Sequence, residues 1–251
     1  MKTVFERPRL FKEADFHYCP GCGHGIINRL LMEVIDEMDL QGDAICVAPA
    51  GCGMLLYNYF EIDVIESAHG RGAAVATGIK RVRPQNLVFS YQGDGDLAAI
   101  GTGEIVHAAA RGEAITAVFV NNGIYGMTGG QMAPTTLIGQ KTTSCPLGRD
   151  PAFAGAPIPM TEMLAVLPGV AYAARGSVMD ASAIGRTKQY LKKACQVQLD
   201  RAGFAIVEVL SNCPVGWGMT PVESIEHLRN DVAPVYPPGV IVDRTAPARG
   251  G

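Results

Sequence analysis

Residues 87–126 read LVFSYQGDGDLAAIGTGEIVHAAARGEAITAVFVNNGIYG, and this stretch decides the fold class. It contains two apolar runs rich in strand-forming residues, at 87–91 and 115–120, with a helical pattern at 97–111 between them. Apolar runs without a polar face are typical of parallel strands that helices cover on both sides. The stretch therefore predicts a strand, helix and strand of a parallel sheet, with Gly-Asp-Gly-Asp and Asn-Asn-Gly turns directly after the two strands.

The same alternation extends over most of the 251 residues. Further helices are expected near 24–40, 72–82 and 180–202, and further strands at 44–48, 63–66 and 204–210. We therefore expect an α/β fold with a mostly parallel sheet flanked by helices. Residues 121–160 are rich in Gly, Pro, Ser and Thr and have little periodicity, so they predict an extended loop that lines a site.

The two ends of the chain differ from its centre. Residues 1–23 predict an N-terminal arm that contains a Cys-x2-Cys pair, and residues 24–210 form the main domain. Residues 211–251 are rich in Pro and Gly, which predicts a C-terminal arm that wraps the domain or a partner, with extended backbone at 232–238.

Composition and charge exclude several classes of protein. With 21 basic and 24 acidic residues the net charge is -3, so the chain has no basic surface for nucleic acid or an anionic membrane. No window contains the ~20 apolar residues of a membrane helix. Residues 1–16 alternate charged and apolar side chains, unlike a signal peptide. We expect a cytoplasmic protein with no nucleic-acid and no membrane partner.

Asp94 and Asn122 stand in the turns that follow two neighbouring predicted strands. The carboxyl ends of parallel strands share one edge of the sheet, where ligands bind and where helix starts present N–H groups to phosphate. Since Mg2+ prefers oxygen ligands together with substrate phosphates, Asp94, the Asn122 amide oxygen and a backbone carbonyl suit a magnesium site. Taken singly, either segment could be an ordinary turn.

Taken together, with one helix and one strand between them, the two turns resemble the binding motif of thiamine diphosphate enzymes. The resemblance implies Mg2+ ligation by Asp94, Asn122 and the carbonyl of Ile124. It also implies contacts to the diphosphate or thiazolium from Gly95, Asp96, Gly126 and Met127.

The chain has seven cysteines, an odd number that argues against a disulfide set in a reducing compartment. Cys19 and Cys22 precede the first predicted helix. Cys52 and Cys213 each follow a predicted strand, so they should emerge at the edge that carries Asp94. Four thiolates beside an organic redox cofactor suit a 4Fe-4S cluster, while a zinc ion with the same four ligands is the alternative.

The other three cysteines are weaker candidates. Cys46 lies inside a predicted strand and Cys195 inside a predicted helix, where a free cysteine usually packs as a small hydrophobic residue. Cys145, in the long loop, remains a reserve fourth ligand.

Six ordered segments together resemble the β subunit of 2-oxoacid:ferredoxin oxidoreductases. They are CPGCGHG (19–25), PAGCG (49–53), SAHGRGAAVATGIK (67–80), QGDGD (92–96), NNGIYGMTGGQMAPTT (121–136) and LSNCPVGWGMTP (210–221). The resemblance implies a 4Fe-4S cluster on Cys19, Cys22, Cys52 and Cys213. It also implies contacts to thiamine diphosphate from Ala50, Gly51, Cys52, Gly53 and His69.

The activity that this resemblance implies is oxidative decarboxylation of a 2-oxoacid with CoA to acyl-CoA and CO2, with electrons passing through the cluster to ferredoxin. The segment MAPTTLIGQKTT (132–143) resembles members that use branched-chain acids or 2-oxoglutarate, which favours 2-oxoisovalerate first and 2-oxoglutarate next. No residue of the chain is expected to act as a general base.

The same resemblance implies partners and leaves one alternative open. An α subunit would supply the carboxylate that protonates the aminopyrimidine, and a ferredoxin-like subunit or ferredoxin would accept electrons, so the chain should be inactive alone. The alternative is a non-oxidative thiamine diphosphate decarboxylase or a non-catalytic subunit. The cysteine set discriminates between them, because non-oxidative decarboxylation does not require it.

Overall fold

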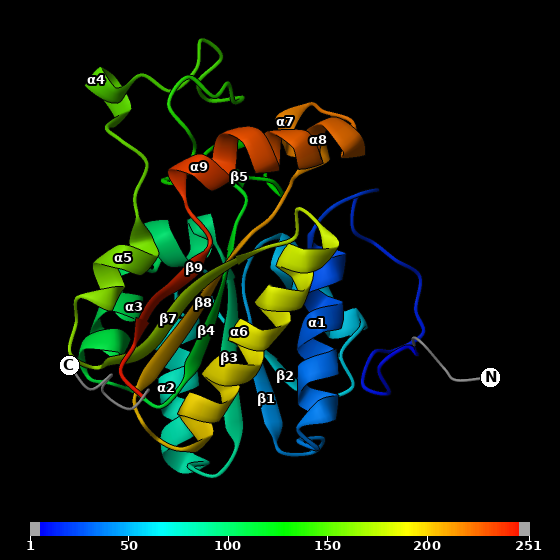
Figure 1. The fold of residues 1–251 in the computed structure, drawn as a ribbon, viewed down its shortest axis with the longest axis vertical. Coiled ribbons are helices and arrows are strands. Elements are labelled where there is room, and N and C mark those ends of the chain that lie inside the picture. Colours follow the sequence, from blue (N-terminus) through cyan, green and yellow to red (C-terminus); the bar gives the residue numbers. More distant parts are fainter. Residues whose placement is uncertain (1–5, 246–251) are drawn as a thin grey trace.

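A seven-stranded, mostly parallel sheet lies at the centre of the protein (Figure 1). The computed structural model describes residues 6–245, so the outer ends of both predicted arms, residues 1–5 and 246–251, lie outside the described residues. The strand order is β2-β1-β3-β4-β8-β7-β9, and all neighbours are parallel except β9, which runs antiparallel to β7. The predicted α/β class is therefore confirmed.

All five predicted strands belong to this sheet. Four of them lie in its interior, and the strand at 63–66 forms one edge. The strands of the sheet are β1 (Ala44–Ala48), β2 (Asp63–Glu66), β3 (Leu87–Gly93), β4 (Thr116–Asn121), β7 (Val170–Ser177), β8 (Phe204–Leu210) and β9 (Gly239–Asp243). A separate short pair is formed by β5 (Ile124–Tyr125) and β6 (Gln131–Met132).

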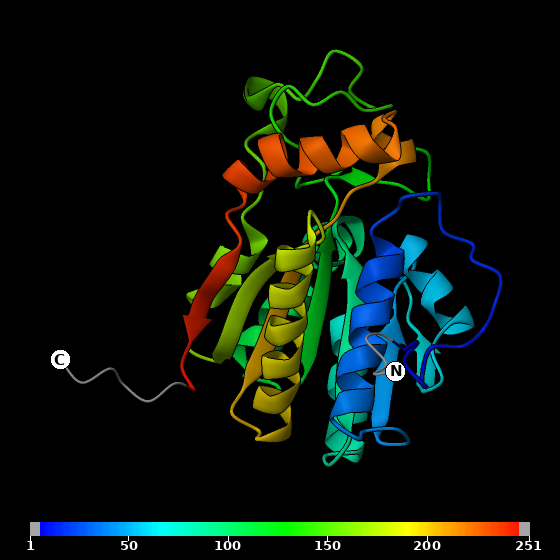
Figure 2. The ribbon, with the colours of Figure 1, turned by 45° about the vertical axis from the view of Figure 1, so that its right-hand side comes forward.

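Helices cover both faces of the sheet, which gives three layers (Figures 1 and 2). One face packs against α1 (His24–Glu37) and α6 (Ala181–Leu199). The other packs against α2 (Gly72–Val82), α3 (Thr102–Ala110) and α5 (Met160–Ala165). Within residues 6–245, no helix has the length and apolar character needed to cross a membrane.

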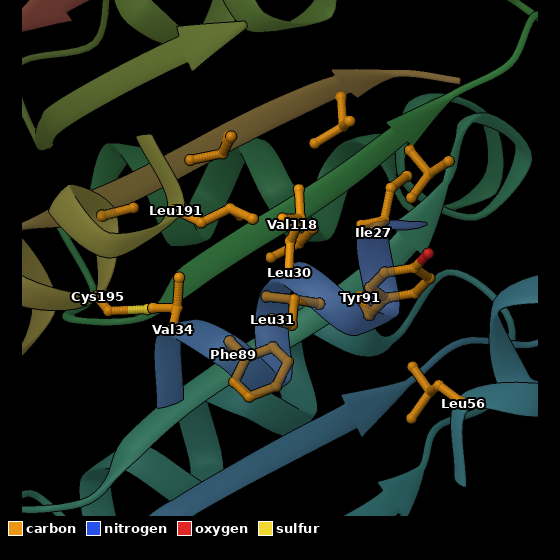
Figure 3. Packing of buried hydrophobic residues seen from close by; sticks show 14 of the residues in the cluster. Ile27, Leu30, Leu31, Val34, Leu56, Phe89, Tyr91, Val118, Leu191 and Cys195 are labelled. Atoms are coloured by element: carbon orange, nitrogen blue, oxygen red, sulfur yellow. The ribbon is translucent and has the colours of Figure 1, made fainter. Parts of the chain in front are cut away.

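Helix α1 shows why the apolar spacing specifies this packing. Its apolar residues recur at helical spacing, so Ile27, Leu31 and Val34 share one buried face. They pack in the same cluster as Phe89 of β3 and Val118 of β4 (Figure 3). Each such side chain contributes about 1.5 to 3 kcal/mol when fully buried, so this apolar face stabilises the packing of α1 on the sheet.

The segments that follow the parallel strands gather at one edge of the sheet. A 3-10 helix, η1 (Cys52–Asn58), follows β1, and a π-helical turn, η2 (Asp96–Ile100), follows β3. Four helical segments after β8 lie across this edge, and the loop that contains α4 projects beyond them (Figure 2). These are α7 (Pro214–Trp217), α8 (Pro221–His227), η3 (Leu228–Val232) and α9 (Ala233–Val235), with α4 at Pro151–Ala154.

Two features differ from the sequence-based expectations. The prediction of extended backbone over residues 232–238 was wrong, because the chain stays helical to Val235. Pro234 lies in the first turn of α9, where its missing N–H costs no hydrogen bond. Strands β7 and β9 were not expected; β7 begins with the apolar run 170–174, but three of these five residues are alanines, which are poor strand formers, and Arg175 and Gly176 follow.

Arg175 belongs in the buried strand β7 because its charge is paired there. Its side chain is 1% exposed, and its Nε donates to Glu208 Oε2 at 2.8 Å, while its two terminal nitrogens donate to Glu162. Glu208, also 1% exposed, accepts further hydrogen bonds from Asn121 at 2.7 Å and Thr161 at 2.5 Å. Both buried charges are thus matched by partners on neighbouring elements.

Arg175→Met should lower the free energy of unfolding by about 3 to 5 kcal/mol, because Glu208 would remain as a buried charge without its cationic partner. The free energy of unfolding of the double variant Arg175→Met/Glu208→Gln should be closer to that of the wild type, since this variant removes both charges. Urea unfolding followed by circular dichroism measures the three values.

Glu162→Gln is the control. The Glu162 side chain is 42% exposed, so loss of its ion pair with Arg175 should lower the free energy of unfolding by less than about 1 kcal/mol. A double variant as unstable as the single one would contradict the pairing argument.

Candidate functional site

A pocket opens at the carboxyl edge of the sheet, between the turns that follow β1, β3 and β4. This shared location follows from the common direction of the three strands. Twelve of the predicted site residues line it: Ala50, Gly51, Cys52, Gly53, His69, Asp94, Gly95, Asp96, Asn122, Ile124, Gly126 and Met127. The structure therefore brings these residues together, and what they bind stays a prediction.

Asp94 is a buried carboxylate at the junction of two of these turns. It is 3% exposed, its Oδ2 accepts the Thr135 hydroxyl at 2.8 Å, and its Oδ1 accepts the Gly95 N–H at 3.0 Å. Burial raises the pKa of Asp94 to about 6, and this rise is opposed by the Thr135 hydroxyl and by the N–H groups of Gly95, Gly123 and Ile124. These donors are neutral, so a bound divalent cation would supply the countercharge that this carboxylate needs.

The Asn122 turn is positioned by hydrogen bonds from two directions. The Thr136 hydroxyl donates to the Gly123 carbonyl at 2.6 Å, and the indole N–H of Trp217 donates to the Asn122 carbonyl at 2.9 Å. Within the turn, Asn122 Oδ1 accepts the Ile124 N–H at 3.4 Å. The oxygen atoms of Asp94 and of this turn thus lie within one small region, and they are the hard donors that Mg2+ prefers.

Arg149 organises the segment that carries Thr135. Although it lies in the projecting loop, it is 5% exposed. Its guanidinium donates to the backbone carbonyls of Ala133, Pro134 and Thr136 on one side, and to those of residues 154–156 on the other. The loop is therefore ordered around a buried cation, which places Thr135 against Asp94.

His69 is oriented by Asp96. His69 Nδ1 lies 2.7 Å from Asp96 Oδ1, which also accepts the Gly70 N–H at 2.8 Å, while Gln92 donates to the other carboxylate oxygen. Asp96 is 2% exposed, whereas the His69 side chain is 46% exposed toward the pocket side. Asp96 therefore uses its oxygens to position the His69 turn.

The four predicted cluster ligands lie close enough to affect one another. Burial raises the pKa of Cys22 to about 11 and of Cys213 to about 12, and each would also be destabilised as a thiolate by charge on the neighbouring cysteines. Burial raises the pKa of Cys52 as well, and charge on Cys19 raises it further. Thiols that oppose one another's ionisation in this way are stabilised as thiolates when they share a metal centre.

Two glycines allow the sulfurs of Cys52 and Cys213 to approach the pocket. A Cβ atom on Gly126 would lie 3.4 Å from the Cys213 sulfur and 3.5 Å from the Cys52 sulfur. A Cβ on Gly216 would lie only 2.8 Å from the Cys213 sulfur. The sulfurs of Cys52 and Cys213 therefore flank the turn that lines the pocket.

The remaining cysteines lie elsewhere. Cys46 and Cys195 are buried in the core, where burial raises the pKa of both thiols, as expected for core residues. Cys145 donates to the Gly148 carbonyl within the projecting loop. Within the described residues, no group of three His, Cys, Asp or Glu side chains has an arrangement that could hold a metal ion by itself.

Several residues of the site were missed by sequence reasoning. Tyr125, Thr128 and His24 also line the pocket, and Nδ1 of the buried His24 lies 2.6 Å from the Tyr91 hydroxyl. Trp217 was quoted only as part of a motif. His24 and Trp217 lie in the segments 19–25 and 210–221 that carry the family resemblance, and this was the sequence signal that could have identified them.

Comparison with known families gives one model match. The model described as "Thiamine pyrophosphate enzyme, C-terminal TPP binding domain" matches residues 54–209. This range includes Asp94 and the Asn122 turn, and it agrees with the predicted thiamine diphosphate-binding fold.

Two curated relatives have substantial identity. The chain is 44% identical over 246 residues to the ketoisovalerate oxidoreductase subunit VorA of Methanothermobacter thermautotrophicus, covering 98% of this chain and 52% of VorA. It is 36% identical over 220 residues to the 2-oxoglutarate synthase subunit KorB of Methanocaldococcus jannaschii, covering 85% of this chain and 77% of KorB. The chain thus spans about half the length of the VorA relative.

A solved structure has the same fold. It is the 2-oxoglutarate:ferredoxin oxidoreductase from Magnetococcus marinus with 2-oxoglutarate, coenzyme A and succinyl-CoA bound. The match has a TM-score of 0.77 at 24% identity and covers 98% of this chain and 88% of that chain.

His24→Gln should flatten the pH dependence of stability of the metal-free chain between pH 6.5 and 4. Burial lowers the pKa of His24 from 6.5 to about 4. As the pH falls through this window the unfolded state binds the proton first, so the wild-type chain loses stability, whereas glutamine can still accept from Tyr91 but does not titrate.

Urea unfolding is measured at pH 6.5 and at pH 4. Between these two pH values, the free energy of unfolding of the wild-type chain should fall by on the order of 2 kcal/mol more than that of the variant. Carboxylates such as Asp94 titrate in both proteins, so their effects cancel in the difference. Equal losses in the two proteins would contradict the lowered pKa.

Proposed function

Since this chain belongs to the thiamine diphosphate-binding β subunits of the 2-oxoacid:ferredoxin oxidoreductases, we propose that it provides the diphosphate half-site and one 4Fe-4S cluster of such an enzyme. The reaction is oxidative decarboxylation of a 2-oxoacid with CoA to acyl-CoA and CO2, and ferredoxin accepts the electrons. The proposal extends to this chain what the names of its relatives describe.

The observation that carries the proposal is the position of Cys52. It lines the pocket together with Asp94 and the Asn122 turn, and its sulfur flanks Gly126 beside the sulfur of Cys213. A cofactor held in this pocket and a cluster on these cysteines would be neighbours. This proximity favours the oxidative function over the non-oxidative alternative, which has no use for the cysteine set.

In the proposed site, Asp94, the Asn122 amide oxygen and the Ile124 carbonyl would hold Mg2+ together with the diphosphate. Ala50, Gly51, Gly53, Gly95 and Met127 surround the cofactor, and Asp96 orients His69 toward it. Thiamine diphosphate, when bound, would supply the carbon nucleophile for the keto group and the electron sink that decarboxylation needs. The chain's own residues bind and orient the cofactor and exclude water.

Cys19, Cys22, Cys52 and Cys213 are the proposed ligands of the cluster. Each thiolate in a 4Fe-4S cluster binds a different iron, so the sulfurs need not meet around a single ion. The backbone N–H groups of His24 and Gly216 act to lower the pKa of the Cys22 and Cys213 thiols, against the effect of burial, and N–H groups near cluster sulfurs tune a cluster's potential. Zinc would need tighter convergence of the same four side chains.

The pocket favours an apolar 2-oxoacid. Ile124, Tyr125 and Met127 form part of its lining, and none of the described residues that line it is a lysine or an arginine. A second substrate carboxylate would be buried against this half-site without a cation, which is costly. We therefore place 2-oxoisovalerate first and 2-oxoglutarate second.

Exposed apolar side chains near the pocket fit an interface with an α subunit. Tyr57 of η1 is 43% exposed, Ile100 of η2 is 52% exposed, and Met127 is 47% exposed. The α subunit would supply the carboxylate for the aminopyrimidine and part of the acyl and CoA sites, and a ferredoxin-like subunit or ferredoxin would take the electrons. Cys19, Cys22 and Cys213 lie outside residues 24–210, in the proposed arms, and would complete the ligand set of the cluster.

The proposed compartment is the cytoplasm. All seven cysteines are free thiols, as a reducing compartment requires. An exposed Cys19 and a low-potential cluster are compatible with such surroundings.

Anaerobically purified protein should contain about four irons per chain and show a broad visible absorption that bleaches on reduction. Cys213→Ser should lower the iron content, because one thiolate ligand is lost. Cys145→Ser is the matched control and should leave the iron content unchanged. Stoichiometric zinc without iron would overturn the cluster.

The activity is tested with the isolated chain and with the assembled complex, using a viologen dye, CoA and a 2-oxoacid. The isolated chain should show no turnover, and addition of the α subunit should restore it. The kcat/KM for 2-oxoisovalerate should exceed that for 2-oxoglutarate by about tenfold, the factor that 1.4 kcal/mol of differential binding produces.

Asp94→Ala should abolish turnover and Mg2+-dependent cofactor binding in the complex, because one of few protein-supplied magnesium oxygens is lost. Glu13→Ala, at a carboxylate that is 88% exposed, is the control and should change neither. Substantial activity from the isolated chain, or unchanged cofactor affinity in Asp94→Ala, would refute the proposed function.

A further inference from the structure

Helix α7 connects the two proposed cofactor sites through only four residues. It starts directly after Cys213, and its last residue is Trp217. The Trp217 N–H donates to the Cys213 carbonyl at 2.9 Å, and a Cβ atom on Gly216 would lie 2.8 Å from the Cys213 sulfur, so α7 packs directly against that sulfur. The position of Trp217 is therefore tied by this hydrogen bond and by packing to that of a proposed cluster ligand.

The other end of this connection is the Asn122 turn. The indole N–H of Trp217 donates to the Asn122 carbonyl at 2.9 Å. Asn122 carries one of the proposed magnesium ligands, and its own amide oxygen accepts from Ile124. One side chain thus links the segment that ends in the cysteine set to the turn that completes the magnesium site.

The indole is itself held from its opposite side. The His227 ring meets it edge-on, with ring centroids 4.9 Å apart and an angle of 82° between the planes. His227 Nδ1, at the end of α8, lies 2.7 Å from Oδ2 of Asp231 in η3. The indole therefore has a defined orientation, which a single hydrogen bond on a mobile side chain would not provide.

A second contact joins the same two segments without passing through the indole. A Cβ on Gly216 would lie 2.8 Å from the Cys213 sulfur and 3.1 Å from Ile124 Cγ2. The Cys213 sulfur, α7 and the β5 turn are thus packed at van der Waals distance. A displacement of Cys213 therefore requires the Asn122 turn or the Trp217 hydrogen bond to move.

We propose that Trp217 is a positioning residue that makes the magnesium-diphosphate site and the cysteine set form together. A cluster on Cys213 fixes α7, α7 fixes the indole, and the indole fixes the Asn122 carbonyl. The inference rests on the proposed function, because it concerns the two groups assigned there. It adds a coupling between them: cluster occupancy raises the affinity for Mg2+-thiamine diphosphate, and by linkage the cofactor helps to retain the cluster.

The coupling is measured as a ratio of two dissociation constants in the assembled complex. Mg2+-thiamine diphosphate is titrated by calorimetry into the cofactor-free complex with its cluster intact, and again after oxidative removal of the iron. Loss of one oriented hydrogen bond corresponds to about fivefold in affinity. The wild-type complex should therefore bind the cofactor about fivefold more weakly without the cluster.

Trp217→Phe keeps an aromatic ring against His227 and removes the N–H donor. In this variant, the ratio of the cofactor's dissociation constants without and with the cluster should fall close to one. Val215→Ala, on the same helix and at a side chain that is 68% exposed, is the matched control and should keep the wild-type ratio. A purely structural role for Trp217 would lower the melting temperature of Trp217→Phe and leave its ratio unchanged, and that result overturns the proposal.

A second variant covers the case in which Trp217→Phe does not fold. Trp217 is the only tryptophan of the chain, so replacement of tryptophan by β-(3-benzothienyl)alanine during its expression exchanges the indole N–H for sulfur at this position alone. The ring shape is retained, and the ratio should again approach one. A wild-type ratio in this protein overturns the proposal.

Failure of the inference is distinguishable from failure of the proposed function. If the wild-type complex binds the cofactor and iron but its ratio is one, only the coupling is refuted. If the wild-type complex contains no iron or does not bind thiamine diphosphate, the proposed function is refuted and the coupling with it.

Discussion

The common direction of the parallel strands is the constraint on which the rest of the structure depends. Because β1, β3, β4 and β8 run the same way, the turns that follow them meet at one edge. Four segments far apart in sequence therefore contribute to one region: residues 49–53, 93–96, 122–128 and 211–217. Helix packing on both faces keeps the strands aligned, so the site inherits its rigidity from the core.

Burial of polar groups at this edge is offset by specific hydrogen bonds. Asp94 is matched by Thr135 and by backbone N–H groups, and the loop that carries Thr135 is ordered around the buried guanidinium of Arg149. Below the edge, Glu208 pairs with Arg175 and accepts from Asn121, the residue before Asn122. Buried polar groups thus lie both in the middle of the sheet and at the pocket, and Arg175, Glu208 and Asp94 each have hydrogen-bond partners.

Local sequence was sufficient for elements whose apolar pattern matches their burial. Strands at 44–48, 63–66 and 204–210 were predicted to the residue, and helix α1 differed only at its carboxyl end. Strand β7 could not be predicted, because Arg175 is compatible with a buried strand only when Glu208 and Glu162 are already beside it. The prediction of extended backbone at 232–238 was wrong for a related reason: the Pro-containing pattern indicates an extended chain, while packing across the sheet edge favours helix up to Val235.

The sequence by itself determined the α/β class, the order of most strands along the chain, and the two Gly-rich turns with the cysteines that accompany them. These depend on local periodicity and on residue types that only certain chemistry requires. Only the tertiary structure decided that His24, Arg149, Thr135 and Trp217 belong to the same site. Arg149 donates to carbonyls 5 to 16 positions away and acts on the site through the Thr135 segment. The roles of His24, Thr135 and Trp217 arise instead from hydrogen bonds between residues 41 to 95 positions apart in the chain, such as Thr135 to Asp94 and Trp217 to Asn122. No local pattern encodes such pairs, because they form only after the strands have aligned their carboxyl ends.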